Sequence, residues 1–389
     1  LLDGADGRTL AVESRMNPQA QYGADVIMRA NYALEHGTEA LSMCVRKAVN
    51  EMLGSLAEDA GIRREDVFQV CVVGNTCMHH LFLGISPASL VHAPYTPAVS
   101  ERLVLNAGDY GLAVQERAEL IMLSDIAGYV GADTCGCLLA IRQDQQEEIS
   151  LMIDIGTNGE MVLGNRERMV TCSTAAGPAF EGAKIECGMR GAAGAVDHVK
   201  YEDGKWNYTT VGNKPAVGLC GSGLIDLVAG LLDAGMLDEN GVLRSGQEKQ
   251  GVFILVLPER GGNERGVYLT QKDLGEVQLA KAAIAAGIQM LMERLGITED
   301  DICSVYIAGA FGNYMDPVSA GKIGLLPATL VKKVKPVGNA AGEGAKIALV
   351  NEKEMLEMDE LVRKIEFVEL AASADFQDHF IDELGFETG

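Results

Sequence analysis

The sequence predicts an α/β fold made of two related lobes. An internal repeat is the first observation: residues 60–76 align without a gap with residues 295–311, and glycine, isoleucine, aspartate, valine and glycine coincide at five positions. Each copy follows a long helical pattern and ends in a glycine turn after a buried-strand pattern. A strand–turn–strand pattern at residues 153–163 is the third observation. Ordinary alternation of helices and strands is the alternative explanation of the repeat.

Each copy of the repeat is predicted to run helix, glycine stop, short acidic turn and strand. Gly61 and Gly296 follow the helices, where a C-cap glycine belongs. Ligands of open α/β sheets bind outside the carboxyl ends of strands, so two such turns would face each other across a cleft. The helices are predicted from apolar residues on one face: Leu41, Val45, Ala48, Met52 and Leu56, and Val277, Ile284, Ile288, Leu291 and Leu295.

The expected domain organisation follows the order of the chain. We expect a first lobe at residues 1–150, a second lobe at 151–350, and a C-terminal extension at 351–389 that packs back on the core. The repeat offset places the counterpart of Asp154 before residue 1. The first lobe is therefore expected to lack a phosphate hairpin of its own in this chain.

The composition narrows the class of partner. Of the 389 residues 48% are hydrophobic, and 55 acidic residues against 32 basic ones give a formal charge of −23. This balance argues against nucleic acid and against an anionic membrane surface, since both require clustered Lys and Arg. The longest apolar stretch, residues 217–232, is too short and too polar to span a bilayer.

The cysteines favour a reducing compartment. The chain has nine scattered cysteines, an odd number, which is typical of reduced thiols in the cytoplasm rather than of a disulfide framework. Cys135 and Cys137 form the one close pair, and a single intervening residue is not the usual spacing of zinc ligands. No cysteine set has the spacing of an iron–sulfur cluster.

The turn at residues 153–163 has the composition of a phosphate- and metal-binding hairpin. Asp154 is expected to face Mg²⁺, directly or through water, because Mg²⁺ prefers oxygen ligands and keeps several of its waters. Glu160 adds a second carboxylate on the next strand. We expect these two residues to be catalytic.

The residues between these carboxylates are expected to hold phosphate. Glycine leaves the backbone free to approach an anion and to adopt positive φ, and the polar side chains add donors. The alternative is an ordinary hairpin, since Asn-Gly is the strongest short signal for a type I′ turn. The residues concerned are Gly156, Thr157, Asn158 and Gly159.

Other turns are candidates for the same site. The run Gly309, Ala310, Phe311 and Gly312 comes after a buried strand and offers an apolar wall for a base. The run Gly221, Ser222 and Gly223 opens an apolar helix, where N–H groups attract anions, although a close helix contact explains it equally well.

Lesser candidates complete the set. Residues 338–345 are a small-residue run that opens a helix and is equally explained by packing. Adjacent histidines at 79 and 80 point to different sides of a helix, which disfavours joint metal ligation. The polar residues at strand ends and in the loop after the hairpin are Asn75 and Thr76, and, in second rank, Ser173, Thr174 and Glu181.

Together these segments resemble the acetate/sugar kinase, Hsp70 and actin superfamily, an RNase H-like fold of two lobes with a nucleotide cleft. The resemblance rests on residues 153–160, 221–223 and 307–312. One branch is similar along nearly the whole chain: the reductive activators of corrinoid-dependent proteins, whose ATPase module was once a domain of unknown function. Its signatures are residues 17–19, 22–27, 73–81, 127–133 and 273–284.

The resemblance implies an ATP- and Mg²⁺-dependent activator in the cytoplasm. It would reduce inactive Co(II) to Co(I) in a corrinoid protein or corrinoid methyltransferase, and a homodimer is expected from the family. Electrons would come from an upstream [2Fe–2S] domain that we expect to lie outside this chain. By the same resemblance, residues 156–159 hold phosphate and residues 309–312 hold adenosine.

Two alternatives remain open from the sequence. The first is a small-molecule kinase of the same superfamily, which would need a positioned general base in the first lobe. The second is a docking module that binds the corrinoid protein and never hydrolyses nucleotide.

Overall fold

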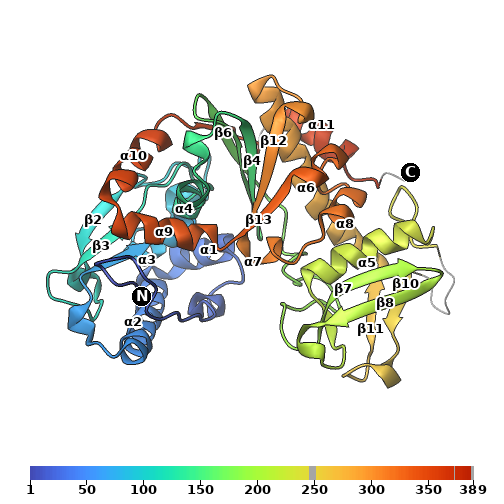
Figure 1. Cartoon of the computed structure of the whole chain (residues 1–389), viewed down its shortest axis with the longest axis horizontal. Coiled ribbons are helices and arrows are strands. Elements are labelled where there is room, and N and C mark those ends of the chain that lie inside the picture. Colours follow the sequence, from blue (N-terminus) through green and yellow to red (C-terminus); the bar gives the residue numbers. More distant parts are fainter. Residues whose placement is uncertain (245–250, 372, 387–389) are drawn as a thin grey trace. The chain divides into compact units, whose positions relative to one another are not determined.

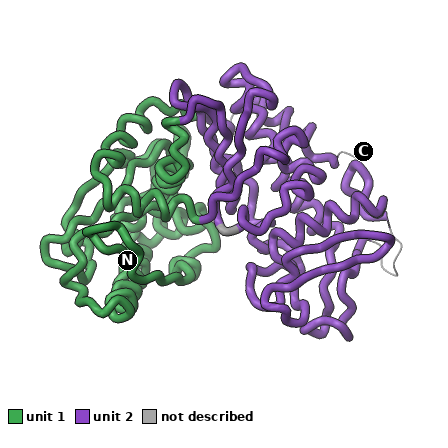
Figure 2. Tube along the Cα trace, viewed as in Figure 1, with its two compact units in different colours: residues 1–145, 339–367 green, residues 146–338, 368–389 purple. Residues whose placement is uncertain are grey.

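The computed structural model of the chain describes residues 1–244, 251–371 and 373–386, and of Ala310 the backbone alone. The chain forms two compact units (Figure 2): residues 1–145 with 339–367 make unit 1, and residues 146–338 with 368–389 make unit 2. Residues 339–350, expected with the second lobe, thus lie in unit 1. The expected extension at 351–389 is divided between the two units.

Unit 1 is a mixed α/β body. Three of its strands form a sheet in the order β1-β3-β2, with β1 parallel and β2 antiparallel to β3. The elements are α1 (Val26–His36), α2 (Glu39–Ala60), β1 (Gln69–Val72), α3 (Thr76–Leu83), β2 (Leu103–Asn106), β3 (Glu119–Met122), α4 (Ala132–Ile141), α9 (Ala340–Val350), α10 (Glu352–Val362) and β14 (Glu366–Phe367).

Helix α9 belongs to unit 1 because it packs on α4, far away in sequence (Figure 1). The helices meet at Gly136 and Gly344, where a Cβ on Gly344 would overlap the Gly136 carbonyl. Helix α10 is held by polar contacts: Arg102 Nε and Ser124 Oγ donate to the Asp359 carboxylate at 2.8 and 2.9 Å. These contacts explain why chain order alone misplaces residues 339–367.

Unit 2 contains the predicted hairpin. Its main sheet includes β13-β12-β4-β5-β6 in this order; β13, β12 and β4 are parallel, and β4, β5 and β6 are antiparallel. Strands β8-β7-β9 and β10-β11 form smaller sheets. The strands are β4 (Ile149–Ile155), β5 (Gly159–Gly164), β6 (Met169–Thr174), β7 (Ala195–Glu202), β8 (Lys205–Thr210), β9 (Gly218–Leu219), β10 (Val252–Val256), β11 (Val267–Thr270), β12 (Ile302–Ala308) and β13 (Val334–Gly338).

Long and short helices cover these sheets. Helix α6 packs on β5 and β6, and its buried face, which includes Val277, Ile284 and Ile288, joins the large core of unit 2. Among the described helices, none combines the length and the hydrophobicity that crossing a membrane requires. The helices of unit 2 are α5 (Gly221–Asp233), α6 (Gln271–Leu295), α7 (Gly309–Gly312), α8 (Pro317–Lys322) and α11 (Ala374–Asp382).

Candidate functional site

Asp154 lies near the carboxyl end of β4, at the centre of the candidate site. Its cross-strand partners are Ala308 on β12 and Glu160 on β5. Its carboxylate receives no hydrogen bond within the part of the chain that the structure describes, and burial raises its pKa above the ordinary value. Gly309 has φ +84°, and a Cβ there would lie 2.9 Å from Asp154 Oδ1. A side chain at position 309 would therefore be strained and would crowd this carboxylate.

Glu160 and Ser173 continue this polar row across the sheet. Glu160 pairs with Asp154 on one side and with Ser173 on the other, so all three side chains project from one face. Ser173 Oγ lies 3.5 Å from Glu160 Oε1. Thr174 is buried, and its hydroxyl lies 3.4 Å from the Gly159 carbonyl. Of the second-rank residues in β6, Ser173 thus shares the face of Asp154.

The hairpin tip differs from the turn that the sequence suggested. Strand β4 ends at Ile155 and β5 begins at Gly159, and Gly156 N–H donates to the Asn158 carbonyl at 2.9 Å. Neither Gly156 nor Gly159 has positive φ, so the expectation of positive φ was wrong, as was the type I′ alternative. Packing favours glycine at position 159, since a Cβ would lie 2.9 Å from Thr174 Oγ1 and 3.2 Å from Ile284 Cγ1 of α6.

A loop after β6 contacts the hairpin tip. Gly177 N–H donates to the Thr157 carbonyl at 2.8 Å, and Thr157 Oγ1 donates to Glu181 Oε1 at 2.6 Å. In the same loop the Phe180 ring stacks on Phe311, with centroids 5.7 Å apart and planes at 16°. The loop therefore connects the hairpin with the turn at 309–312. Sequence reasoning ranked Glu181 second and missed Phe180, for which the sequence gives no local signal.

The turn at 221–223 joins this cluster through close packing. A Cβ on Gly221 would lie 2.7 Å from Phe311 Cε2, and one on Gly223 would overlap the Val196 carbonyl. Ser222 Oγ donates to the Asp197 carbonyl at 2.8 Å. The close-contact explanation accounts for both glycines, and anion binding by this turn stays a prediction.

The turn at 309–312 forms helix α7 and is followed by a cavity. Gly312 is needed for packing, because a Cβ there would lie 2.5 Å from Ile307 Cγ2. The cavity has a volume of about 590 Å³, and Asn313, the residue after α7, is among those that line it. Its walls come from β7, α5 and α8, and Ala229, Gly230 and Tyr314 are among the residues that line it.

A buried carboxylate stands in the wall of this cavity. His198 Nδ1 and Asp226 Oδ2 are 3.1 Å apart, and Asp226 also accepts a hydrogen bond from the Val199 N–H at 3.3 Å. Burial raises the pKa of Asp226. Neither residue was a candidate in the sequence.

Asn75 and Thr76 lie in unit 1, where local structure uses their polar atoms. Asn75 caps α3, accepting a hydrogen bond from Met78 N–H at 2.9 Å, and Thr76 Oγ1 donates to the Ala127 carbonyl at 2.6 Å. These contacts stabilise the start of α3. A nucleotide-binding role for either residue stays a prediction.

The adjacent histidines have separate structural partners. His79 Nδ1 lies 2.9 Å from Asp125 Oδ2, and Asp125 Oδ1 accepts from the Ala132 N–H at 2.9 Å. His80 Nε2 accepts from the Ala98 N–H at 3.0 Å, while its Nδ1 lies 2.8 Å from the Thr76 carbonyl. The two imidazoles thus face different partners.

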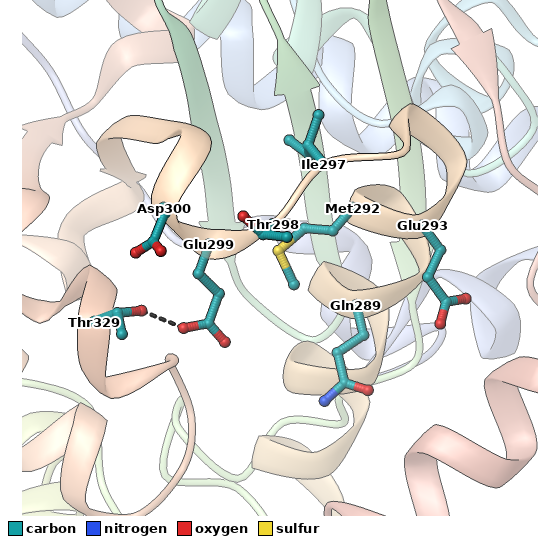
Figure 3. Close-up of a pocket in the computed structure, with 8 residues that line it drawn as sticks. All are labelled: Gln289, Met292, Glu293, Ile297, Thr298, Glu299, Asp300 and Thr329. Carbon is teal, nitrogen blue, oxygen red and sulfur yellow. Dashed lines mark hydrogen bonds between the residues drawn. The ribbon is translucent and has the colours of Figure 1, made fainter.

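Unit 2 has a second pocket, and Figure 3 shows the eight residues that line it. It has a volume of about 490 Å³ and lies where α6 ends and β12 is about to begin, whereas Asp154 pairs with the last residue of β12. Met292 and Ile297 form its apolar part, and Glu299 reaches across to Thr329. No predicted site residue lines this pocket.

The residues at the hairpin fit a Mg²⁺–nucleotide better than a metal held by protein alone. Within residues 1–244, 251–371 and 373–386, no group of three or more His, Cys, Asp or Glu could hold a metal ion. Mg²⁺ commonly binds through one or two carboxylates and substrate phosphates. Asp154 supplies such a carboxylate beside the half-buried hairpin tip.

Comparison with known proteins connects this geometry to one family. Residues 148–388 match the family model described as the C-terminal domain of RACo, the ASKHA domain, which is the kinase, Hsp70 and actin superfamily fold. Residues 1–146 match the RACo middle region. The structure is similar to a solved reductive activator for corrinoid, iron–sulfur protein, with a TM-score of 0.89 and 37% identity over 99% of this chain. The predicted fold class is therefore confirmed.

Two curated relatives carry related names. The corrinoid activation enzyme RamQ of Eubacterium limosum is 35% identical over 98% of this chain, and the [Co(II) methylated amine-specific corrinoid protein] reductase of Methanosarcina barkeri is 26% identical over 94%. The chain spans 67% and 71% of these relatives and 63% of the solved activator. From its fold, its hairpin and these matches, the chain belongs to the family of reductive activators of corrinoid proteins.

Proposed function

We propose that this chain is the ATP-binding part of a reductive activator, which couples ATP binding and hydrolysis to the reduction of Co(II) to Co(I) in a corrinoid protein or methyltransferase. One electron passes to cobalt, and a protein carrying a [2Fe–2S] cluster supplies it. Family membership and the names of the relatives support the reaction. The observation that carries the nucleotide site is the loop at 177–182, which contacts both the hairpin tip and Phe311.

In this proposal the hairpin binds the phosphates and the cavity after Gly312 binds the nucleoside. Asp154 would hold Mg²⁺ or one of its waters, and the bound cation would neutralise phosphate charge. The N–H groups of Thr157 and Asn158 and the Thr157 hydroxyl would donate to phosphate oxygens. The 590 Å³ cavity that Asn313 helps to line has room for a nucleoside, and Tyr314 offers an aromatic surface.

Lobe closure on nucleotide gives a physical route from ATP to cobalt. Nucleotide can shift the activator between two states only if these states bind the corrinoid protein differently. Glu160 would then assist Asp154 in orienting the attacking water. Hydrolysis would thus depend on these two carboxylates, and partner recognition on other surfaces of the chain.

The test follows Co(I) formation by its absorbance. The chain is mixed with a Co(II) corrinoid protein and a reduced [2Fe–2S] protein, with ATP, with a non-hydrolysable analogue, and without nucleotide. We expect Co(I) to accumulate with ATP and to fall sharply with Asp154→Asn. Corrinoid-protein binding that ignores nucleotide would instead favour a docking module. ATP turnover that requires a small phosphoryl acceptor would favour a kinase.

A further inference from the structure

Glu181 accepts a hydrogen bond from the Thr157 hydroxyl, the same group that the proposed function assigns to phosphate binding. Thr157 Oγ1 donates to Glu181 Oε1 at 2.6 Å, and this oxygen lies 3.8 Å from the position of a Cβ on Gly156. The carboxylate therefore rests against the turn of the hairpin. A phosphate oxygen that accepts from Thr157 must share or replace this contact.

The backbone of the loop holds Glu181 in place. Glu181 N–H donates to the Pro178 carbonyl at 3.1 Å, and the preceding Phe180 ring stacks on Phe311. Gly182 has φ +80°, and a Cβ there would lie 2.6 Å from Met189 N, so the next residue must be glycine. The position of Glu181 is thus fixed by its two neighbours in the chain, the stacked Phe180 and the required Gly182.

The charge at the hairpin tip is not neutralised by a basic partner of Glu181. Within the described residues Glu181 forms no ion pair, and the nearest cation in its loop, Lys184, is directed to Glu276 of α6 at 3.4 Å. The Asp154 carboxylate near the end of β4 likewise lacks an ion pair. An incoming phosphate therefore meets like charge at the position where it would bind.

We propose that Glu181 is a specificity-determining residue, which makes the hairpin select the cation complex of a nucleotide over the free nucleotide. Without a cation, the phosphate is repelled by Glu181 and competes with it for the Thr157 hydroxyl. A divalent cation placed between the phosphate and the Glu181 carboxylate attracts both groups and so offsets their mutual repulsion. This inference rests on the proposed nucleotide site and adds a residue to it.

The test is the ratio of two affinities. ADP is titrated calorimetrically into the wild-type chain and Glu181→Gln, in excess Mg²⁺ and in excess chelator. Loss of one negative charge beside the bound phosphate is expected to strengthen the binding of metal-free ADP by about tenfold. Binding with Mg²⁺ is expected to stay equal or weaken. The preference for the Mg²⁺ complex thus falls at least tenfold, and Glu181→Ala is expected to do the same.

Matched variants separate this effect from general changes of charge. Glu167→Gln removes an exposed carboxylate in the β5–β6 turn, at the other end of these strands, and is expected to keep the wild-type ratio. In Thr157→Val, which lacks the shared hydroxyl, replacing Glu181 is expected to have a smaller effect on metal-free binding.

Each outcome decides between the inference and the function beneath it. If the wild type binds ADP and both Glu181 variants keep its ratio, the inference is overturned while the nucleotide site stands. An equal loss of affinity in Mg²⁺ and in chelator also overturns it, because Glu181 then supports the fold of the loop. If the wild type binds no nucleotide in either condition, the proposed function fails and the inference fails with it.

Discussion

The two copies of the internal repeat share a scaffold, one in each unit. Helices α2 and α6 both end at a left-handed glycine, Gly61 with φ 67° and Gly296 with φ 70°. Each then enters a short turn closed by an aspartate: Asp66 accepts from the Arg63 N–H at 3.0 Å, and Asp301 accepts from the Thr298 N–H at 2.8 Å. Each turn leads into a strand with a parallel neighbour.

The copies differ in the turn at the carboxyl end of the strand. After β1 comes α3, whose cap Asn75 uses its side chain to hold the start of the helix. After β12 comes α7, which begins at Gly309 with positive φ beside the Asp154 carboxylate. The same scaffold thus carries two different turns. In unit 1 the turn side chain is used to cap a helix, and we call this the closed turn. In unit 2 the turn starts at a glycine beside the Asp154 carboxylate, and we call this the open turn. The difference lies in the turn residues, and substitutions in both units can test it.

The largest effect on ATP turnover is expected from a substitution at Asp154, beside the open turn. Asp154→Asn keeps the shape of the side chain and removes the charge that would hold Mg²⁺, so ATP turnover is expected to fall at least about a hundredfold. Stability should be retained, because burial already disfavours the charged form. Turnover and thermal unfolding are measured together. Wild-type turnover in Asp154→Asn would remove this residue from the mechanism.

The stability of unit 1 is expected to depend on the packing of α9 against α4. Gly344→Val would force a side chain into the Gly136 backbone, at a cost of about 3 kcal/mol of unfolding free energy. Gly74→Ala is the control, since its Cβ would make an ordinary contact at 3.7 Å with Met78. Hydrogen exchange should report the loss in unit 1 and not in unit 2. Equal loss in both units would contradict the division of the chain.

At the closed turn the effect should be on stability alone. Asn75→Ala removes the N-cap of α3 and is expected to lower the unfolding free energy by about 1 kcal/mol. Chemical denaturation measures this loss. In contrast to Asp154→Asn, turnover below the denaturation range should be unchanged; a large drop would show that unit 1 also contributes a nucleotide-binding residue there.

Acid should weaken unit 1 through His80. Burial lowers the pKa of this imidazole, whose Nε2 accepts a hydrogen bond from Ala98 N–H. Because the folded pKa lies below the unfolded value of about 6.5, this contribution is complete above that pH and is lost as the pH falls through and below it. The melting temperature at pH 7.5 and 5.5 tests this. His80→Gln is expected to show a smaller difference between the two.

The smallest expected effect is a gain in unfolding free energy from a substitution in α6. Gly275 lies within this helix with open space around it, so Gly275→Ala is expected to add about 0.5–1 kcal/mol. Gly54 of α2 is the comparison, because a Cβ there would overlap the Arg64 guanidinium. Denaturation midpoints of both variants measure this contrast, and a larger gain at Gly54 would contradict it.

Local patterns made much of the scaffold predictable. Helical periodicity and stop glycines identified α2 and α6, because a helix buries one face and ends where a left-handed residue is needed. The same reasoning located the hairpin with Asp154. Its turn geometry was misjudged, since Gly159 serves packing against Ile284 rather than positive φ.

Long-range contacts account for the rest. The Thr157–Glu181 hydrogen bond and the Phe180–Phe311 stack join segments that no periodicity relates. The same holds for residues 339–367. Chain order would place them with the second lobe and the extension, whereas the packing of α9 on α4 and the hydrogen bonds of Asp359 with Arg102 and Ser124 place them in unit 1. Nucleotide binding by the predicted residues stays a prediction, which titration of the wild-type chain with ADP decides.

The return of α9 and α10 to unit 1 has a consequence for biosynthesis. The ribosome makes residues 1–145 before residues 340–350, so the surface of α4 that receives α9 stays uncovered until residue 350 has been made. Unit 2 can bury most of its core before that point. Unit 1 therefore begins to be made before unit 2 but is completed after most of it, and in the interval the exposed α4 surface is a part of the nascent chain that a chaperone would need to protect.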